Sequence, residues 1–558
     1  MIRQWEEAGI SLVDAANKYL SLCLSLNTSA RLSRANKGIK EALAFWMDSA
    51  LSPGGLHSIL DQKIAQSRSL MAQTRNRILA ASIYQFPAEI LSEIFLNVIY
   101  DKDNFEGDPV YITTGIKLIY QRLHQILGVC SNWRNVGIAC PSLWSFIPVI
   151  HEDDGFSLRM ATNLSLQRAP GANLYLAAIL PPYPPYKLFD DLAKHRSRFR
   201  AINMVIPNEA PRQLEHFFDR MLKPASHPPS ELSLYLRRPS DSDDDIDTAL
   251  NLKQRLFCEL LPQFTEFLVS LSKIRFSGAG VRWDQVIFSD RLIELQLEDF
   301  VLGHKPDLDT FLTALSSASK LQVLSLTSIT TFNITPEIPE HSDRNPTISL
   351  PGLKRLHIED LYFNTLRDVI GSISQGQHQL TLVLTTNSLQ IAAPAGLDFQ
   401  DASINALCEV VSSTPVDTLL LCGRRRGGWL DEEELEALLQ AAPSVKTLKM
   451  SHWRFRSSEC RVLTRPQSSD GAFPAIKNMH LCWAGIIDQE GFKSMVTSHP
   501  IQRMVLGGYT ESEPGDFFDP FRGSEEIVAW LDSNIPNFRL YDLDYEPPEF
   551  KLTEWQLW

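Results

Sequence analysis

The sequence predicts an α+β protein in which an all-α N-terminal region precedes an irregular α/β solenoid. Apolar residues recur every three or four positions within residues 1–26, 37–50 and 56–82, a spacing typical of amphipathic helices. The helix expected at 56–82 is either a short coiled coil or a helix packed on its neighbours. From about residue 199 onward, strand-like segments alternate with helix-like segments. A chain of 558 residues is too long for one ordinary core, so we expect several units.

The composition is that of an ordinary globular protein. Hydrophobic residues make up 44% of the chain, and charged residues 21%. The formal net charge of -13 provides no excess of Lys and Arg to neutralise phosphates, so we expect no nucleic-acid partner. The sequence has neither a secretory pattern nor an apolar run of the roughly 18 residues that span a bilayer. We therefore expect no membrane partner and a cytoplasmic or nuclear location.

Signatures of catalysis and of metal binding are missing from the sequence. The eight cysteines are scattered with no CxxC pair, which predicts neither a disulfide framework nor a zinc site. The motifs GxSxG, GxxxxGK[ST] and HExxH are also absent. We expect a protein that is not an enzyme and that needs no metal or cofactor.

The segment YQFPAEILSEIFLNVI, residues 84–99, carries the pattern of a helix with a marked beginning. Pro87 is tolerated in the first turn of a helix, and Glu89 suits its positive end. Ile90, Leu91, Ile94 and Phe95 follow as an apolar stripe.

A second helical segment, residues 118–136, carries further apolar residues, and the turn PSLW follows at residues 141–144. The apolar members of this segment are Leu127, Val129, Cys130 and Trp133. Taken in order, the motifs of residues 84–147 resemble an F-box, particularly the form found in large fungal F-box families. The sequence departs from the family in having Phe86 where leucine is commoner and in lengthening the link between the first two helices.

The resemblance implies a three-helix unit that docks on the adaptor subunit of an SCF-type cullin-RING ubiquitin ligase, and through it on the cullin. Leu143 and Trp144 would pack this unit onto the next part of the chain. The residues that the resemblance assigns to adaptor binding are Phe86, Pro87, Ile90, Leu91, Ile94 and Trp133.

Recurring hexads with apolar residues at positions one, four and six predict the strands of the second region. The clearest are LIELQL (292–297), LQVLSL (321–326), LKRLHI (353–358), VDTLLL (416–421), VKTLKM (445–450), IKNMHL (476–481) and IQRMVL (501–506). FRAINM (199–204), LSKIRF (271–276) and QLTLVL (379–384) match less closely. The pattern resembles a leucine-rich-repeat solenoid, in which stacked strand-helix units bury one continuous core. The Asn or Cys usual three positions past each hexad is present only as Asn387, so no internal Asn ladder is expected.

Strand alternation directs hexad positions four and six inward and positions three and five outward. The outward row is polar and of mixed charge, which suits protein recognition but is equally what any solvated sheet face shows. An arginine trio after VDTLLL could bind an acidic or phosphorylated partner, or form a solvated turn. The candidate partner-binding residues are Arg355, His357, Arg424, Arg425, Arg426, Lys449, Trp453, His480 and Trp483.

The predicted organisation has five parts. They are a helical region (1–83), the F-box (84–147), a linker with a degenerate first repeat (148–198), the leucine-rich-repeat-like domain (199–510) and a C-terminal cap (511–558). We expect a non-catalytic substrate-recognition subunit that binds the ligase adaptor and an unknown target protein. The alternative is a repeat scaffold for protein interactions with no role in ubiquitin ligation.

Overall fold

The computed structural model describes most of the chain as two compact units, residues Met1–Pro87 and Ala88–Trp558. The described residues are 2–32, 37–79, 86–100, 112–150, 156–180, 186–207, 211–222, 228–237, 261–278, 286–332, 347–394, 399–423, 428–467, 473–511, 518–543, 547 and 550. Within these ranges, no helix is both long enough and apolar enough to cross a membrane.

The first unit consists of three helices, α1 (Ile2–Leu32), α2 (Lys37–Leu51) and α3 (Leu56–Leu79). They coincide with the three amphipathic segments, although α1 continues beyond residue 26, where the apolar pattern ends. A turn follows α2, in which the amide of Gly54 donates to the carbonyl of Ser52. Much of the apolar surface of this unit is open to solvent, since Trp5 is 59% exposed and Trp46 is 71% exposed.

The second unit opens with three helices that pack on one another, α4 (Ala88–Ile99), α5 (Ile112–Val129) and α6 (Ser131–Ala139). The short turn η2 (Pro141–Trp144) comes next and contacts α4. The Nε1 of Trp144 donates to the carbonyl of Gly137 at 2.9 Å, which holds η2 against α6. On its other side the Trp144 ring meets Arg168, farther along the chain, whose guanidinium carbon lies 4.4 Å from the ring centroid. Trp144 thus contacts both the three helices and the part of the chain that follows them.

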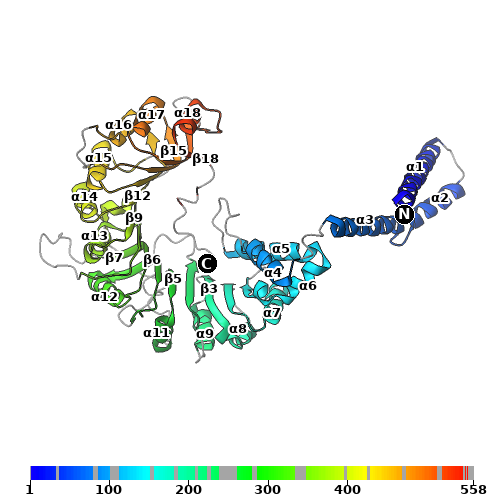
Figure 1. Ribbon diagram of the computed structural model, residues 1–558, viewed down its shortest axis with the longest axis horizontal. Coiled ribbons are helices and arrows are strands. Elements are labelled where there is room, and N and C mark those ends of the chain that lie inside the picture. Colours follow the sequence, from blue (N-terminus) through cyan, green and yellow to red (C-terminus); the bar gives the residue numbers. More distant parts are fainter. Residues whose placement is uncertain are drawn as a thin grey trace. The chain divides into compact units, whose positions relative to one another are not determined.

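A sheet of 16 strands, all parallel except at β17, follows the three helices in the described second unit (Figure 1). The strands are β1 (Phe146–Val149), β2 (Leu174–Ile179), β3 (Phe199–Pro207), β4 (Glu231–Arg237), β5 (Lys273–Ser277), β6 (Glu294–His304), β7 (Val323–Phe332), β8 (Arg355–Glu359), β9 (Gln379–Leu384), β12 (Thr418–Cys422), β13 (Thr447–Ser451), β14 (Arg454–Phe455), β15 (Asn478–Ile486), β16 (Arg503–Glu511), β17 (Phe518–Pro520) and β18 (Asn537–Tyr541). A separate two-stranded sheet joins β10 (Gln390–Ile391) to β11 (Gln400–Asp401).

One layer of helices covers one face of the large sheet, along the outer side of the curved row of strands in Figure 1. The helices are α7 (Phe156–Arg168), α8 (Tyr186–Ala193), α9 (Pro211–Met221), α11 (Leu261–Ser270), α12 (Lys305–Leu315), α13 (Phe363–Ser372), α14 (Ile404–Ser412), α15 (Glu432–Ala441), α16 (Ser457–Leu463), α17 (Gln489–Thr497) and α18 (Glu526–Asn534). We call the opposite face, which carries hexad positions three, five and seven, the helix-free face. One hydrophobic core runs between the two layers, from Leu91 on α4 to Ile535 after α18.

The structure contains both helices and strands, as the predicted alternation of the two requires. The hexads of neighbouring strands pair with one another in register. In β12 to β18 the third hexad residue pairs with the third residue of the next strand, in the column Thr418, Thr447, Asn478, Arg503 and Asn537. At β9 the frame steps by two residues, because Gln379 pairs with Arg355 whereas Thr381 pairs with Thr418. A step of two leaves every side chain on its predicted face.

The sheet is longer than the repeat region 199–510. It begins at β1, where WSFIPV (144–149) fits the hexad pattern with Trp144 in position one, and it ends at β18, where IPNFRL (535–540) fits as well. The hexad pattern did not predict the strand β4, because Pro229 occupies position one of its hexad. The residues predicted as a C-terminal cap therefore contribute two strands, β17 and β18, to the same sheet, and the helix α18 to the layer beside it.

Six of the described repeats carry a residue in the left-handed region at the eighth position, two residues after the hexad ends. They are Gly278, Asp299, Ser328, Asp360, His452 and Trp483, with φ between 47° and 67°. Only one of them is glycine, the residue that adopts this conformation without strain. Asp360 shows how a polar residue stabilises this turn, because its carboxylate accepts hydrogen bonds from Ser328 Oγ (2.8 Å), Thr385 Oγ1 (2.6 Å) and Asn387 Nδ2 (3.0 Å). The hydrogen bonds of this carboxylate link three neighbouring repeats, which is the role that an internal Asn ladder would have.

Candidate protein-binding surfaces

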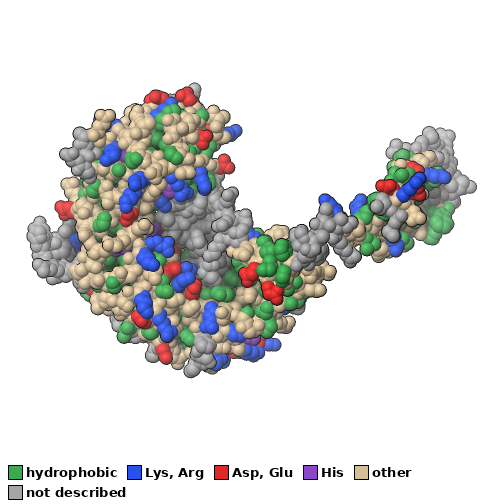
Figure 2. Space-filling model, in the orientation of Figure 1, with side chains coloured by type: hydrophobic (Ala, Val, Ile, Leu, Met, Phe, Trp, Pro, Cys, Tyr) green, Lys and Arg blue, Asp and Glu red, His purple; other side chains and the backbone are tan. Residues whose placement is uncertain are grey.

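Helix α4 carries an apolar stripe that faces solvent. Phe86 precedes the helix and is 45% exposed. Within the helix, Ile90, Ile94 and Val98 follow one another at intervals of four and are 47%, 40% and 47% exposed. Side chains four apart lie on one side of a helix, so they form a continuous strip. We call this strip the α4 stripe. Figure 2 shows hydrophobic side chains gathered over α4 with acidic side chains beside them.

A second stripe, one residue further along, provides the core of the three-helix unit. Leu91, Phe95 and Ile99 are buried to 1% exposure or less. The two stripes are rotated by about 100° around the helix, since a turn takes 3.6 residues. Leu91 is therefore a core residue, which corrects its assignment to the adaptor-binding surface. Trp133 is half-buried with its ring 4.9 Å from that of Phe95, so most of its contacts are internal.

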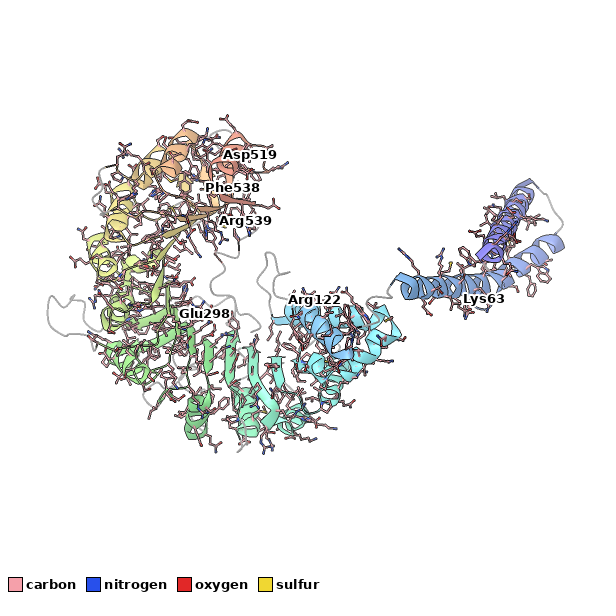
Figure 3. The ribbon with its side chains drawn as sticks, viewed as in Figure 1. Lys63, Arg122, Glu298, Asp519, Phe538 and Arg539 are labelled. Carbon is pink, nitrogen blue, oxygen red and sulfur yellow. The ribbon has the colours of Figure 1, made fainter. Side chains whose placement is uncertain are left out.

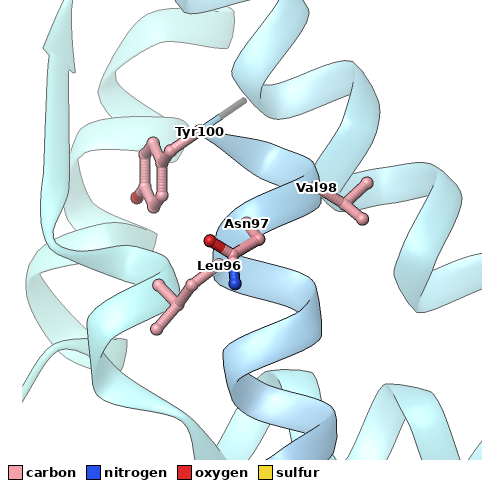
Figure 4. A pocket seen from close by; sticks show the side chains of 4 residues that line it. All are labelled: Leu96, Asn97, Val98 and Tyr100. Carbon is pink, nitrogen blue, oxygen red and sulfur yellow. The ribbon is translucent and has the colours of Figure 1, made fainter. Parts of the chain in front are cut away.

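A pocket with a volume of about 320 Å³ lies at the end of α4, lined by Leu96, Asn97, Val98 and Tyr100 (Figure 4). All four residues come from one helical turn and its end, and none is charged. Burial raises the pKa of Tyr100 to about 12, which keeps its hydroxyl protonated. Within the described ranges, no group of three or more His, Cys, Asp or Glu side chains is placed to hold a metal ion.

The helix-free face is polar and half-open over β5 to β8. Its side chains contact one another, with a salt bridge of 2.7 Å between Arg275 Nη2 and Glu294 Oε1 and a hydrogen bond of 2.8 Å between His357 Nε2 and Glu359 Oε2. Glu298 on β6 lies on the same face (Figure 3). Burial, with the charges of Glu359 and Asp299, raises the pKa of Glu298 to about 7. This part of the face can therefore change its charge near neutral pH.

Over β9 to β16 the same face is covered, which corrects two predicted partner-binding residues. Lys449 and His480 occupy position five of their hexads, as predicted, but they are only 8% and 5% exposed. Their hexad position matches the prediction, whereas their accessibility does not. Of the other predicted residues on this face, Arg355 is exposed, and His357 is half-buried and hydrogen-bonded to Glu359.

The two candidate tryptophans have different surroundings. Trp453 is 2% exposed and its Nε1 donates to the carbonyl of Leu421 at 3.1 Å, so the prediction that it lies on a contact surface is wrong. Trp483 is half-buried and its ring stacks on that of His452, with centroids 5.6 Å apart and planes at 6°. Both stacked residues occupy the left-handed eighth position of adjacent repeats. The predicted arginine trio, 424–426, lies outside the described residues.

Comparisons with known proteins find similarity at the level of structure alone. No protein-family model matches the chain, and no curated protein matches it. A TLR13–ssRNA13 complex matches at 13% identity with a TM-score of 0.29, covering 62% of this chain and 43% of that chain. A complex of Rad7 and Elc1 in yeast matches at 11% identity with a TM-score of 0.35, covering 88% of this chain and 98% of that chain. This chain thus spans less than half the length of the TLR13 chain.

Proposed function

We propose that the chain is a non-catalytic substrate-recognition subunit of an SCF-type cullin-RING ubiquitin ligase. In this proposal residues 84–147 form an F-box that binds the adaptor, and the large sheet with its helices is an irregular leucine-rich-repeat-like solenoid that binds a target protein. The observation that carries the proposal is the α4 stripe. It exposes Ile90 and Ile94, two of the positions that the F-box resemblance assigns to the adaptor.

Burial of the α4 stripe would supply a large part of the docking free energy. Fully burying a large aliphatic or aromatic side chain contributes about 1.5–3 kcal/mol, so a side chain already half-buried contributes about 1 kcal/mol. Three such side chains in one strip fit a hydrophobic groove on a partner, as amphipathic helices commonly do. Glu89 and Glu93 are exposed beside the strip and favour a partner with basic residues around that groove.

The three-helix unit and the sheet share one hydrophobic core, which supports a role in holding two proteins together. Leu91 and Phe95 of α4 belong to the same buried cluster as residues of every later part of the sheet. A target bound to the helix-free face would then be carried near the ligase by this chain. Its contribution to ubiquitin transfer would be proximity, because the transfer chemistry belongs to the partner subunits.

The test is binding of the full chain to the purified ligase adaptor. The double variant Ile90→Asp with Ile94→Asp places two charges in the α4 stripe without touching the core. Its matched control is Ile287→Asp with Ile293→Asp, since these isoleucines are 69% and 39% exposed elsewhere in the second unit. We expect the wild type and the control to bind, and the α4 variant to lose at least about 30-fold in affinity, which corresponds to about 2 kcal/mol.

Two results would overturn this proposal. The folded wild type could fail to bind the adaptor, which would favour a protein-interaction scaffold with no link to ubiquitin. Alternatively, the α4 variant could bind as tightly as the control, which would exclude the α4 stripe as the contact. Circular dichroism and thermal unfolding of all three proteins show whether each is folded.

A further inference from the structure

The first unit, α1 to α3, has no buried side chain among its described residues. Within residues 3–26, 41–42 and 44–75, whose exposure the structure describes, Cys23, Ala50 and Gly55 are half-buried and the others are exposed. Even where α1 contacts α3, with Tyr19 Oη 3.1 Å from His57 Nε2, the tyrosine remains 36% exposed. Helices in proteins derive most of their stability from packing their apolar side, so a partner that covers these helices would stabilise them.

The apolar surface that this unit exposes is as large as one side of a protein interface. Nineteen of the thirty exposed large hydrophobic side chains of the described chain lie within residues 2–79. At roughly 50–100 Å² for each half-exposed side chain, they present on the order of 1,000 Å². A stable interface takes about 800 Å² from each partner, whereas the largest apolar patch of a typical monomer is about 300–600 Å². The exposed area is therefore what a stable dimer needs from each copy.

The apolar side of α1 has the spacing of a coiled-coil seam. Large side chains recur on it every seven residues, and small residues separate them. The large members are Trp5, Leu12, Tyr19 and Leu26, and the small members are Gly9, Ala16 and Cys23. Alternating steps of four and three residues give the period of 3.5 that keeps one side of a helix facing a partner helix. We call these seven residues the α1 seam.

The first half of the α1 seam is open. Trp5 is 59% exposed and Leu12 is 55% exposed. Gly9 and Ala16 are exposed beside them, and a side chain added at Gly9 would meet no atom within 4 Å among the described residues. A small residue in such a seam leaves a hole that a large side chain of a partner helix can enter. This part of the seam thus provides both knobs and unfilled holes.

A second copy of α1 supplies side chains of the right size for these holes. When two α1 seams run antiparallel about a two-fold axis, Trp5 can lie opposite Ala16 of the second copy, and Leu12 opposite Gly9 of the second copy. Each layer then combines a large residue with a small one, which fills the space between two helices without voids. The two-fold axis repeats every contact, so each copy both gives and receives the same knobs.

A membrane surface suits the unit less well than a second copy does. Helices that lie on anionic membranes have a polar side rich in Lys and Arg. The polar residues of α1 instead include the acidic Glu6, Glu7 and Asp14.

We propose that the first unit is a dimerisation module, in which the open half of the α1 seam packs antiparallel on the same seam of a second copy of this chain. The contact covers apolar surface that the single chain leaves exposed. This inference goes beyond the proposed function and does not depend on adaptor docking, because Ile90 and Ile94 of the α4 stripe belong to the second unit.

The first measurement is the mass of the full chain by sedimentation over a range of micromolar concentrations. We expect the wild type to reach twice its chain mass of 63.0 kDa. Leu12→Glu places a charge in the open half of the seam, and the matched control Ser21→Glu places the same charge on the opposite side of α1. The dimer dissociation constant of Leu12→Glu should rise at least about 30-fold, while Ser21→Glu should match the wild type.

The second measurement tests the antiparallel register by disulfide cross-linking of full chains. A chain with Trp5→Cys is mixed with a chain carrying Ala16→Cys under oxidising conditions, and the control mixture replaces Ala16→Cys with Ser21→Cys. We expect a covalent dimer in the first mixture and not in the control mixture. Cross-linking of Trp5→Cys on its own would instead pair it with the native Cys23 of a second copy and would overturn the proposed register.

The proposal is overturned if the folded wild type keeps a mass of 63.0 kDa at every concentration. A monomer that binds vesicles of phosphatidylserine and phosphatidylcholine would assign the α1 seam to a membrane, and one that does not would assign it to a different protein. A dimer that Leu12→Glu leaves intact would place the contact elsewhere. Circular dichroism shows whether each variant is folded, and unchanged adaptor binding by Leu12→Glu separates this test from that of the proposed function.

Discussion

Replacing His480 with leucine should weaken the dependence of the free energy of unfolding on pH. Burial, with the charges of Lys449 and Arg503, lowers the pKa of His480 from 6.5 to about 3. Below pH 6.5 the unfolded chain binds a proton at His480 that the folded chain does not bind. The folded state therefore loses stability as the pH falls from 6.5 towards about 3.

The size of this loss follows from the two pKa values. At about pH 5 the protonated form of His480 outnumbers the neutral form by about 30 to 1 in the unfolded chain, which destabilises the folded state by about 2 kcal/mol. The leucine in His480→Leu cannot bind a proton, so the variant should not show this loss of stability at low pH. At about pH 7.5 it should be as stable as the wild type or slightly more stable, because it removes a buried polar ring without partners.

The assay is urea unfolding of the wild type and of His480→Leu at about pH 7.5 and about pH 5, read by circular dichroism. Burial also lowers the pKa of His499, so other groups contribute to the pH dependence of both proteins. The difference between the two proteins isolates His480. Equal losses of stability in the wild type and the variant between the two pH values would refute the burial argument.

Two further predictions concern the three-helix unit and the turns of the repeats. Leu91→Ala should lower the free energy of unfolding by about 2–5 kcal/mol because it leaves a cavity in the core, whereas Ile90→Ala should change it by less than about 1 kcal/mol. Similar effects of both in urea unfolding would contradict the assignment of the two stripes. Asp360→Ala should destabilise the chain by about 2–4 kcal/mol, since it removes the acceptor of three hydrogen bonds. Asp360→Asn should recover part of this loss because Asn tolerates a positive φ, and an Asn variant no more stable than the Ala variant would count against this role.

The helices and strands could be predicted from sequence because their signals are local. A period of two marks each strand, and the hexad positions assign its faces, so Lys449 and His480 were placed on the correct face of their strands. The proline and acid at the start of α4 mark a helix beginning in the same way. WSFIPV and IPNFRL carry the hexad signal as well, and they identify the first and last parallel strands once the register is known.

The site residues were harder to assign because exposure depends on more than one element. Ile90 and Leu91 are both aliphatic and adjacent, and only the packing of α5 and α6 decides that Leu91 is buried while Ile90 is 47% exposed. Trp453 follows its strand closely enough to suggest an exposed edge, yet its indole bonds to Leu421 of the preceding repeat. Pairwise contacts of this kind have no signature in a single segment.

The sequence by itself determined which segments pair and which face each side chain takes, because strand and helix periods act over a few residues. The tertiary structure decided which parts of those faces meet solvent. The helix-free face is half-open over β5 to β8 and covered over β9 to β16, where Phe550 packs on Val383 and Leu420. That contact joins residues more than a hundred positions apart, and only the folded chain brings them together.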